Sequence, residues 1–344
     1  MINQNQSGKE NKRYQVDPIG GEKSLDQLIK ILISSDDKSE RMAAAWQLGK
    51  INKEKSSSGL LKALSVEDDS DVREEIISSL GWLGDEKTID DLVHIISTEE
   101  SVRVRKKAAW ALGRVQNKDK VIEQLQVALL TDKSADVRSE AAWILGKIKN
   151  PKSASPLESS LFLDASPYVR RISAFSLGQI GGEKVIRILS KALFSELDRE
   201  VRKDVVWILA KSKSSDAVSG LLHALRAEID EEVQRMIVWA LGKLGDHNTS
   251  LSLLDFLEEE SFSDRLKTEI IWTLGKIKGT KPAKVITKCL KSPIKGVKKA
   301  AVWTLAQVKD RAAIKELEKA IASEDDDEMR EELSWAINEI KDSD

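Results

Sequence analysis

A short apolar phrase recurs along this chain, and its spacing constrains the fold more than any other feature. It reads Ala-Ala-Trp-Ala-Leu-Gly-Arg-Val at residues 108–115 and Ala-Ala-Trp-Ile-Leu-Gly-Lys-Ile at residues 141–148. Ten copies follow one another at spacings of 31 to 33 residues, and their glycine position holds Gly49, Gly81, Gly113, Gly146, Gly178, Ala210, Gly242, Gly275, Ala306 and Asn338. A period of this size is typical of stacked units that each contact only their neighbours. We therefore predict one elongated repeat array over residues 21–344.

Each repeat carries two apolar patterns of helical period. The segment 120–130 is expected to form the first helix of one repeat, and its apolar side chains are Ile122, Leu125, Val127, Ala128 and Leu129. The segment 136–149 is expected to form the second helix, with a core stripe within about a quarter of its circumference made of Val137, Ala141, Leu145 and Ile148. Ser134 lies between the two patterns and predicts an N-cap. Helices this short are not stable alone in water, so the stability must come from stacking.

Composition and charge limit the function classes. Of the 344 residues 33% are charged, and 55 Lys and Arg nearly balance 57 Asp and Glu. This balance argues against a generic binder of nucleic acid or of membranes, and no apolar run reaches the length of a membrane span. Residues 1–20 are polar and lack the apolar middle of a secretory signal, so they are expected to be a disordered tail. With one cysteine, Cys289, the chain cannot form an internal disulfide, and a cytoplasmic location is predicted.

A Val-Arg dipeptide opens the second helical pattern in five repeats: Val72-Arg73, Val104-Arg105, Val137-Arg138, Val169-Arg170 and Val201-Arg202. With the Ala-Ala-x-x-Leu-Gly-Lys-Ile close, the unit resembles the HEAT-like repeat first described in phycobilin lyases, and the resemblance covers nearly the whole chain. It implies an all-α fold, a right-handed α-solenoid of about ten two-helix repeats. It implies a function only broadly, because this repeat serves in bilin lyases, assembly chaperones and scaffolds.

The arginines of these dipeptides recur with an acidic residue six positions earlier, as in Asp132 with Arg138 and Asp164 with Arg170. In similar HEAT proteins such pairs form a ladder that ties adjacent repeats together through charge-assisted hydrogen bonds. We therefore expect these arginines to stabilise the array rather than to bind a ligand.

No constellation of catalytic or metal-binding residues is visible in the sequence. The histidines, His94, His223 and His247, are not spaced as metal ligands, and Cys289 takes a position that holds a small apolar residue in other repeats. A buried, unreactive thiol is expected there. One HEAT-like enzyme family, the di-iron deoxyhypusine hydroxylases, is recognised by His-Glu pairs, and this chain contains no His-Glu dipeptide. The sequence predicts no catalytic residue, no metal and no cofactor.

Tryptophan is concentrated at one position of the repeat. Eight of the nine tryptophans occupy it, with Ser78 and Phe175 in the other two repeats: Trp46, Trp110, Trp143, Trp207, Trp239, Trp272, Trp303 and Trp335. The position lies about 200° around the second helix from the core stripe, on its exposed side. In HEAT-like stacks this side lines the concave face. The glycine three residues later is expected to leave room for the neighbouring indole, and whether the indoles serve packing or binding stays open.

Basic residues flank the tryptophans on the same side of the helices: Lys50, Lys106, Lys107, Arg114, Lys147, Arg171, Lys203, Lys211, Arg235, Lys243, Lys276 and Lys299. From the third to the ninth repeat only Glu140, Asp204 and Glu269 oppose them at these positions. We predict a basic, aromatic partner-binding face formed by Trp110, Trp143, Trp207, Trp239, Trp272, Trp303, Lys107, Arg114, Lys147, Lys211, Lys243 and Lys276.

The predicted function is therefore that of a non-catalytic, monomeric scaffold that binds a protein partner with an acidic surface or segment. Two alternatives stay open. One is a bilin lyase or a lyase-like assembly chaperone subunit, in which the indoles stack on a tetrapyrrole and the lysines pair with its propionates. The other is binding of single-stranded nucleic acid, which combines cations with stacking aromatics. The isoelectric point of about 6.1 and the lack of a basic tail argue against nucleic acid.

Overall fold

The computed structural model describes residues 24–51, 53–257, 259, 262–277 and 283–342. Over these residues the chain forms twenty α-helices and no strand, which confirms the all-α prediction. The predicted disordered tail, residues 1–20, lies outside the described part of the chain. Within the described ranges, no helix combines the length and the apolarity needed to cross a bilayer.

The helices alternate between first and second helices of successive repeats. The first helices are α1 (Leu25–Ser34), α3 (Lys53–Leu64), α5 (Ile89–Thr98), α7 (Lys118–Thr131), α9 (Ala154–Leu163), α11 (Glu183–Ser195), α13 (Asp216–Ala227), α15 (His247–Leu257), α17 (Ala283–Cys289) and α19 (Ile314–Ala322). The second helices are α2 (Lys38–Leu48), α4 (Ser70–Leu83), α6 (Val102–Arg114), α8 (Ala135–Ile148), α10 (Pro167–Ile180), α12 (Arg199–Ser212), α14 (Glu231–Leu244), α16 (Asp264–Lys276), α18 (Lys295–Val308) and α20 (Asp327–Lys341).

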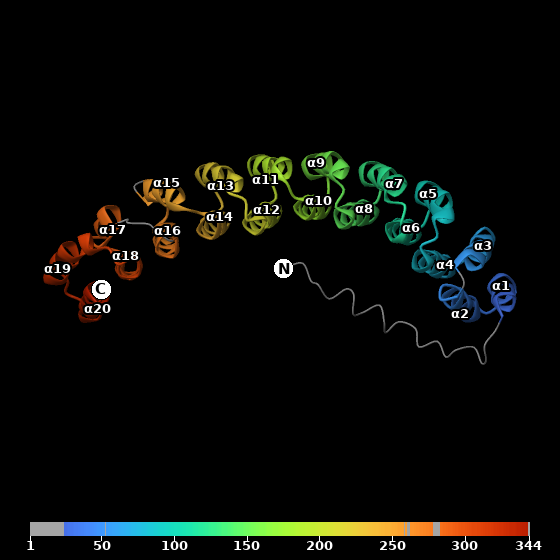
Figure 1. The fold of residues 1–344 in the computed structure, drawn as a ribbon, viewed down its shortest axis with the longest axis horizontal. Coiled ribbons are helices and arrows are strands. Elements are labelled where there is room, and N and C mark those ends of the chain that lie inside the picture. The colour runs from blue at the N-terminus through green and yellow to red at the C-terminus, as the bar shows by residue number, and fades with distance from the viewer. Residues whose placement is uncertain (1–23, 52, 258, 260–261, 278–282, 343–344) are drawn as a thin grey trace. The chain divides into compact units, whose positions relative to one another are not determined.

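The chain divides into two compact units, Met1–Ser160 and Leu161–Asp344, with the boundary inside α9. In the first unit α2, α4, α6 and α8 pack on one another in order, and α1 packs on α3 and α5 on α7. In the second unit α10, α12, α14, α16, α18 and α20 pack in order, and α11 packs on α13 (Figure 1). Each unit is therefore a stack with one layer of second helices and one layer of first helices.

The repeat built from α7 and α8 shows how the apolar pattern becomes a core. Val137, Ala141 and Leu145 of α8 are completely buried, as predicted. On α7 the predicted core residues Ile122, Leu125, Ala128 and Leu129 are also buried. Val127, also among the apolar residues of this helix, is 55% exposed and does not belong to the core. It lies two residues from both Leu125 and Leu129, about 200° around the helix, and therefore faces solvent.

Side chains at the helix N-termini fix where the second helices begin. The hydroxyl of Ser134 accepts a hydrogen bond from the N–H of Asp136, which confirms the predicted N-cap of α8. In α12 and α14 the caps are Asp198 and Asp230, and each carboxylate accepts two backbone N–H groups of its own first turn. These caps satisfy donors that a short helix leaves unpaired.

Candidate binding face

A ladder of ion pairs connects successive second helices to the turns of the following repeats. We call its basic members the ladder cations. Each one bonds a carboxylate that lies 26 or 27 residues further along the chain, and the pairs are Arg41–Glu67, Arg73–Glu99, Arg105–Asp132, Arg170–Glu196, Arg202–Glu228 and Lys298–Glu324. In Arg202–Glu228 the two side chains are only 12% and 6% exposed. A ladder between adjacent repeats is thereby confirmed, although each cation pairs with a carboxylate of the following repeat and not with the acid six residues before it.

The acids six residues before Arg138 and Arg202 each have two separate contacts. The guanidinium of Arg138 donates to the backbone carbonyl of Asp132 at 2.9 Å, whereas the carboxylate of Asp132 is bound by Arg105 of the preceding repeat. Arg202 likewise donates to the carbonyl of Glu196 at 3.1 Å, and Arg170 binds the carboxylate of Glu196. Each rung therefore joins two repeats and fixes the turn between the helices of one. This use of the guanidinium supports a structural role.

The tryptophans of the repeated position, which we call the tryptophan row, lie on the solvent side of the second helices. The side chains of Trp46, Trp207, Trp239, Trp272 and Trp335 are 39–42% exposed, and Trp110, Trp143 and Trp303 are half-buried. Each indole thus packs on one side and meets solvent on the other. This is the environment in which an aromatic residue can both stiffen a stack and contact a partner.

The glycine three residues after the row position is expected from the sequence to leave room for the neighbouring indole. In four repeats, at Gly49, Gly113, Gly178 and Gly242, another side chain lies beside it. A Cβ at Gly113 would lie 2.6 Å from Cγ2 of Ile144, and a Cβ at Gly242 would lie 2.6 Å from Cγ2 of Thr273. At Gly81 and Gly275 the neighbouring indole, Trp110 or Trp303, takes this place.

The contact partners explain the role of the glycine. Ile144 and Thr273 directly follow the row position of the next repeat. The glycine therefore mainly lets neighbouring second helices approach closely, because a Cβ would collide with the side chain opposite.

The ninth tryptophan was missed by the sequence interpretation. Trp82 follows Ser78, which takes the row position in its repeat, by four residues, and it is 54% exposed. Its ring meets that of Trp110 edge to face, with the centroids 5.4 Å apart and an interplanar angle of 72°. Residues four apart share one face of a helix, so the four-residue spacing from Ser78 to Trp82 indicates that Trp82 lies on the face of the tryptophan row.

Cations lie four residues after the row position in six repeats, and five of them lie over an indole. We call Lys50, Arg114, Lys147, Lys211, Lys243 and Lys276 the cation row. Lys211 Nζ lies 4.8 Å from the ring centroid of Trp207, and Lys243 Nζ lies 5.0 Å from that of Trp239. In the first unit Lys147 Nζ lies 5.4 Å from the ring of Trp143, and the Arg114 guanidinium lies 4.8 Å from that of Trp82. These distances are those of cation–π contacts.

The cation row carries uncompensated charge. All six side chains are exposed, and over the described residues none of them forms an ion pair within 4.0 Å. Five of the six lie in the last turn of their helix, where the helix dipole favours positive charge. Lys276 follows Trp272 by four residues. The ring of Trp272 stacks on that of Trp303, with centroids 5.1 Å apart and an interplanar angle of 20°.

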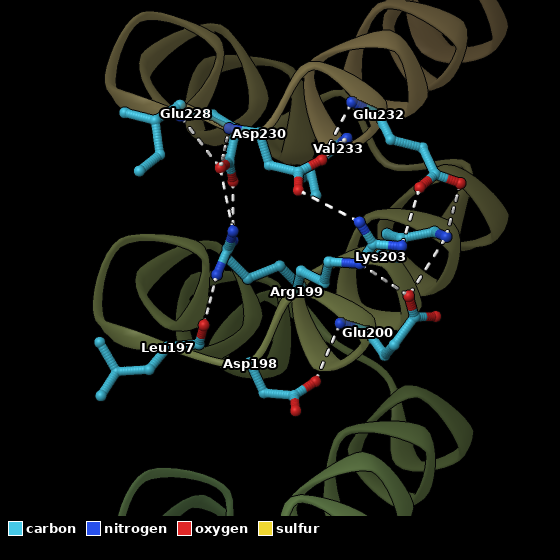
Figure 2. A network of polar contacts seen from close by, with 11 residues as sticks. Leu197, Asp198, Arg199, Glu200, Lys203, Glu228, Asp230, Glu232 and Val233 are labelled. Atoms are coloured by element: carbon cyan, nitrogen blue, oxygen red, sulfur yellow. Dashed lines mark hydrogen bonds and ion pairs between the residues drawn. The ribbon is translucent and has the colours of Figure 1, made fainter.

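Most of the basic residues that precede the tryptophans are paired with acids, which differs from the predicted basic face; Lys106 is exposed and forms no ion pair within the described residues. Arg171 pairs with Asp204 at 2.5 Å and Arg235 with Glu269 at 2.5 Å. Acids that the sequence interpretation did not place on this face add further pairs: Lys203–Glu232 at 2.8 Å, Lys299–Glu328 and Lys299–Glu332 at 2.7 Å, and Lys107–Glu74 at 3.8 Å. Figure 2 shows Lys203 and Arg199 reaching from α12 towards Glu232 of α14.

The face of the second helices is therefore banded along the helix axis. An ion-paired band lies towards the N-terminal ends, the tryptophan row follows, and the cation row lies at the C-terminal ends. Lys107 of the ion-paired band also contacts the tryptophan row, since its Nζ lies 5.3 Å from the ring of Trp110. Apart from Lys106, the uncompensated positive charge of this face thus lies at one edge of the tryptophan row.

The chemistry of the remaining candidate residues is modest. Cys289 is half-buried rather than fully buried as expected, and burial raises the pKa of its thiol, which disfavours the nucleophilic thiolate. No group of three His, Cys, Asp or Glu residues able to hold a metal ion occurs over the described part of the chain.

Comparison with known proteins identifies the repeat. The family model of HEAT repeats matches residues 25–103, 89–178, 159–242, 186–265 and 250–338. No curated protein sequence matches the chain. Among solved structures, the chain is similar to the karyopherin Kap121p bound to the SUMO protease Ulp1p, with 15% identity, a TM-score of 0.68, and coverage of 92% of this chain and 41% of Kap121p.

Other solved structures agree in fold. Kap121p bound to Nup53p gives 16% identity and a TM-score of 0.66 at the same coverage. Kap95p, from a structure that describes its binding to RanGDP, gives 13% identity and a TM-score of 0.51, covering 92% of this chain and 56% of that one. The chain thus spans less than half of Kap121p, and the likeness concerns the solenoid fold. Since the repeat model matches nearly all of the described residues, the chain belongs to the HEAT-repeat family.

Proposed function

We propose that this protein is a non-catalytic scaffold that binds a protein partner through the tryptophan row and the cation row of its second helices. One observation carries the proposal. On a face whose other basic groups, apart from Lys106, are paired with acids, the exposed cations beside the half-exposed indoles have no acidic partner over the described residues. An acidic group brought by a partner would meet positive charge and aromatic surface together.

The energetics of such a face suit protein recognition. Tryptophan and arginine are enriched among the residues whose truncation weakens complexes most, and exposed charges mainly raise the rate of encounter. Karyopherins with the same solenoid fold are seen bound to proteins: Kap121p to the SUMO protease Ulp1p and to Nup53p. These complexes support a protein as the ligand class. We further propose that the second helices line a concave face, that the chain acts as a monomer in the cytoplasm, and that its repeats belong to the subfamily first described in phycobilin lyases.

The experiment is a quantitative capture from extract of the native cells with the full chain and matched variants. One variant carries Trp207→Ala and Trp239→Ala, and a second carries Lys211→Glu and Lys243→Glu. The control carries Lys291→Glu and Lys315→Glu, two exposed lysines outside the cation row. A specific partner should be retained by the wild type and the control and lost from both variants. Its affinity is then measured with the purified pair.

The two variants should weaken the complex in different ways. We expect the lysine variant to lower mainly the association rate, and the tryptophan variant to weaken binding by about 2 kcal/mol or more. A partner that binds all four proteins equally would contradict the proposal, because the contact would then lie elsewhere.

The two alternative functions are outcomes of the same design. A bilin lyase or lyase-like chaperone would show a new visible absorption band after incubation with a bilin, and the tryptophan variant would lose it. Nucleic-acid binding would show an affinity for single strands that falls steeply with salt. Either result would replace the protein partner as the conclusion.

A further inference from the structure

The second unit carries the proposed binding elements in consecutive repeats, and their spacing bears on the form of the partner. Helices α12, α14, α16 and α18 pack side by side in order. They bring Trp207, Trp239, Trp272 and Trp303 to one face, with the exposed cations Lys211, Lys243 and Lys276 one helical turn further along. The face therefore repeats an indole and a cation from helix to helix.

The distance between repeats follows from the helix packing. Packed helices lie about 8–10 Å apart, and small residues at the contact favour the short end of that range. Here glycines occupy the contact, since a Cβ at Gly242 would lie 2.6 Å from Thr273 and one at Gly275 would lie 2.9 Å from Trp303. A ligand that runs across the helices meets an equivalent anchor about every 8–10 Å.

Among regular backbone conformations, one matches this distance with its own side-chain period. A polyproline II helix has three residues per turn and rises about 3.1 Å per residue, so side chains three apart share one face at about 9 Å. A β-strand repeats its face every second residue, at about 6.6 Å. An α-helix repeats at about 5.4 Å per turn. Of these three, only a ligand in the polyproline II conformation would place one side chain from each of its turns on each successive repeat of the protein.

The charge of the face indicates which ligand side chain would lie at each repeat. The ion-paired band on the N-terminal side of the indoles already joins acids to bases, as in Lys203 with Glu232. On the C-terminal side the cations of α12, α14 and α16 are free of acids over the described residues. A carboxylate at every third position would meet these cations in turn. The residues between the carboxylates would lie over the half-exposed indoles, which favours apolar side chains and proline.

We propose that the partner of this face is an extended acidic protein segment in the polyproline II conformation, with a carboxylate at every third residue and apolar residues between; this form of the partner rests on the proposed scaffold function. The segment lies across α12, α14, α16 and α18. Its carboxylates contact Lys211, Lys243 and Lys276, and its apolar residues contact the indoles of the same helices. A segment of this kind gains affinity from its preformed conformation, because little backbone freedom is lost on binding.

The test uses the full chain and two synthetic peptides of identical composition. The first repeats Glu-Pro-Leu five times. The second gathers its glutamates in one block, followed by alternating prolines and leucines. Affinities are measured by calorimetry and by the change in tryptophan fluorescence. The variant carries Lys211→Gln, Lys243→Gln and Lys276→Gln, and the control carries the same change at three exposed lysines off this row, Lys213, Lys291 and Lys315.

The expected result is binding of the regular peptide at least tenfold tighter than the rearranged one. The lysine variant should lose at least tenfold of that affinity, and the control should keep it. Equal affinity for the two peptides, or no binding of either, would overturn the proposal. So would tighter binding of a single-stranded oligonucleotide of equal charge.

The two proposals can fail separately. If a captured protein partner depends on the cation row while the peptides are not distinguished, the scaffold function stands and the extended, three-residue register is wrong. If neither the captured partner nor the peptides respond to the substitutions, both are wrong.

Discussion

Arg105 and Asp132 form a two-point ion pair between consecutive repeats: Nε and Nη2 of the guanidinium donate to the two carboxylate oxygens at 2.9 and 3.0 Å. The side chains are 11% and 6% exposed. The same carboxylate accepts the N–H of Ser134 at 2.7 Å. Asp132 thus holds its own turn and the preceding second helix at once, which makes this contact a structural element of the stack.

Loss of this pair should destabilise the array locally. Arg105→Ala leaves a buried carboxylate without its cation, which costs about 3–5 kcal/mol when such pairs are broken. The control is Lys120→Ala, which removes an exposed ion pair between repeats, to Asp90, and should cost about 1 kcal/mol or less. Hydrogen exchange in α6 and α7 measures the opening free energy. Equal effects of the two substitutions would show that the ladder adds nothing beyond surface charge.

The second helices approach so closely at Gly242 that adding one methyl group there should destabilise the fold. Gly242→Ala places a Cβ 2.6 Å from Cγ2 of buried Thr273 and should lower the free energy of unfolding by about 1–3 kcal/mol. Thr273→Ser removes that methyl group, so the double variant should recover most of the loss. At Gly296, near the start of α18, a Cβ meets nothing within 4 Å. Gly296→Ala should therefore stabilise by up to about 1 kcal/mol. Chemical denaturation checks all four, and a double variant as unstable as Gly242→Ala alone would refute the contact.

The half-exposed indoles should contribute less to stability than core residues do. Trp207 is 40% exposed, so Trp207→Ala should cost about 2 kcal/mol, below the 3–5 kcal/mol of fully buried aromatic deletions. Leu209→Ala, two residues away and completely buried, should cost about 2–5 kcal/mol. Acrylamide should quench the emission of the native chain, because the row faces solvent. Indoles shielded from acrylamide, or a larger loss for Trp207→Ala than for Leu209→Ala, would assign the row to packing alone.

Glu75 should destabilise the fold at neutral pH. Burial raises the pKa of this carboxyl, and neighbouring Glu74 adds to the rise while Lys107 opposes it. The unfolded chain therefore ionises first, near pH 4.3 for an ordinary glutamate. The free energy of unfolding falls as pH rises from there through the higher folded pKa. Glu75→Gln should raise stability at pH 7, and the gain should vanish below about pH 4.

The neighbouring acid gives the control for that effect. Glu74→Gln removes one of the two acids paired with Arg103, whose guanidinium lies 2.7 Å from the Glu74 carboxylate, and should not stabilise at any pH. Thermal unfolding from pH 3 to pH 8 distinguishes the two. A gain for Glu75→Gln that persisted at pH 3 would have a cause other than ionisation.

The sequence by itself determined the repeat, the helices and the side of each helix that meets solvent. Val137, Ala141 and Leu145 are buried, and Trp207 and Trp239 are exposed on the opposite side, because an α-helix returns to the same face every three to four residues. Such local periodicity needs no knowledge of neighbouring repeats. The ladder could be expected only from its resemblance to similar proteins.

The tertiary structure decided which charges on that face are compensated. Glu232 neutralises Lys203 although 29 residues separate them, and Trp272 stacks on Trp303 of the next repeat. Neither contact follows from helical period, since both depend on the register with which one second helix packs on the next. That register is set by the close contact of residues such as Gly242 and Thr273. Packing between helices therefore left the cation row and Lys106 as the free positive charge of this face, where the sequence had indicated an excess of basic residues on both sides of the tryptophans.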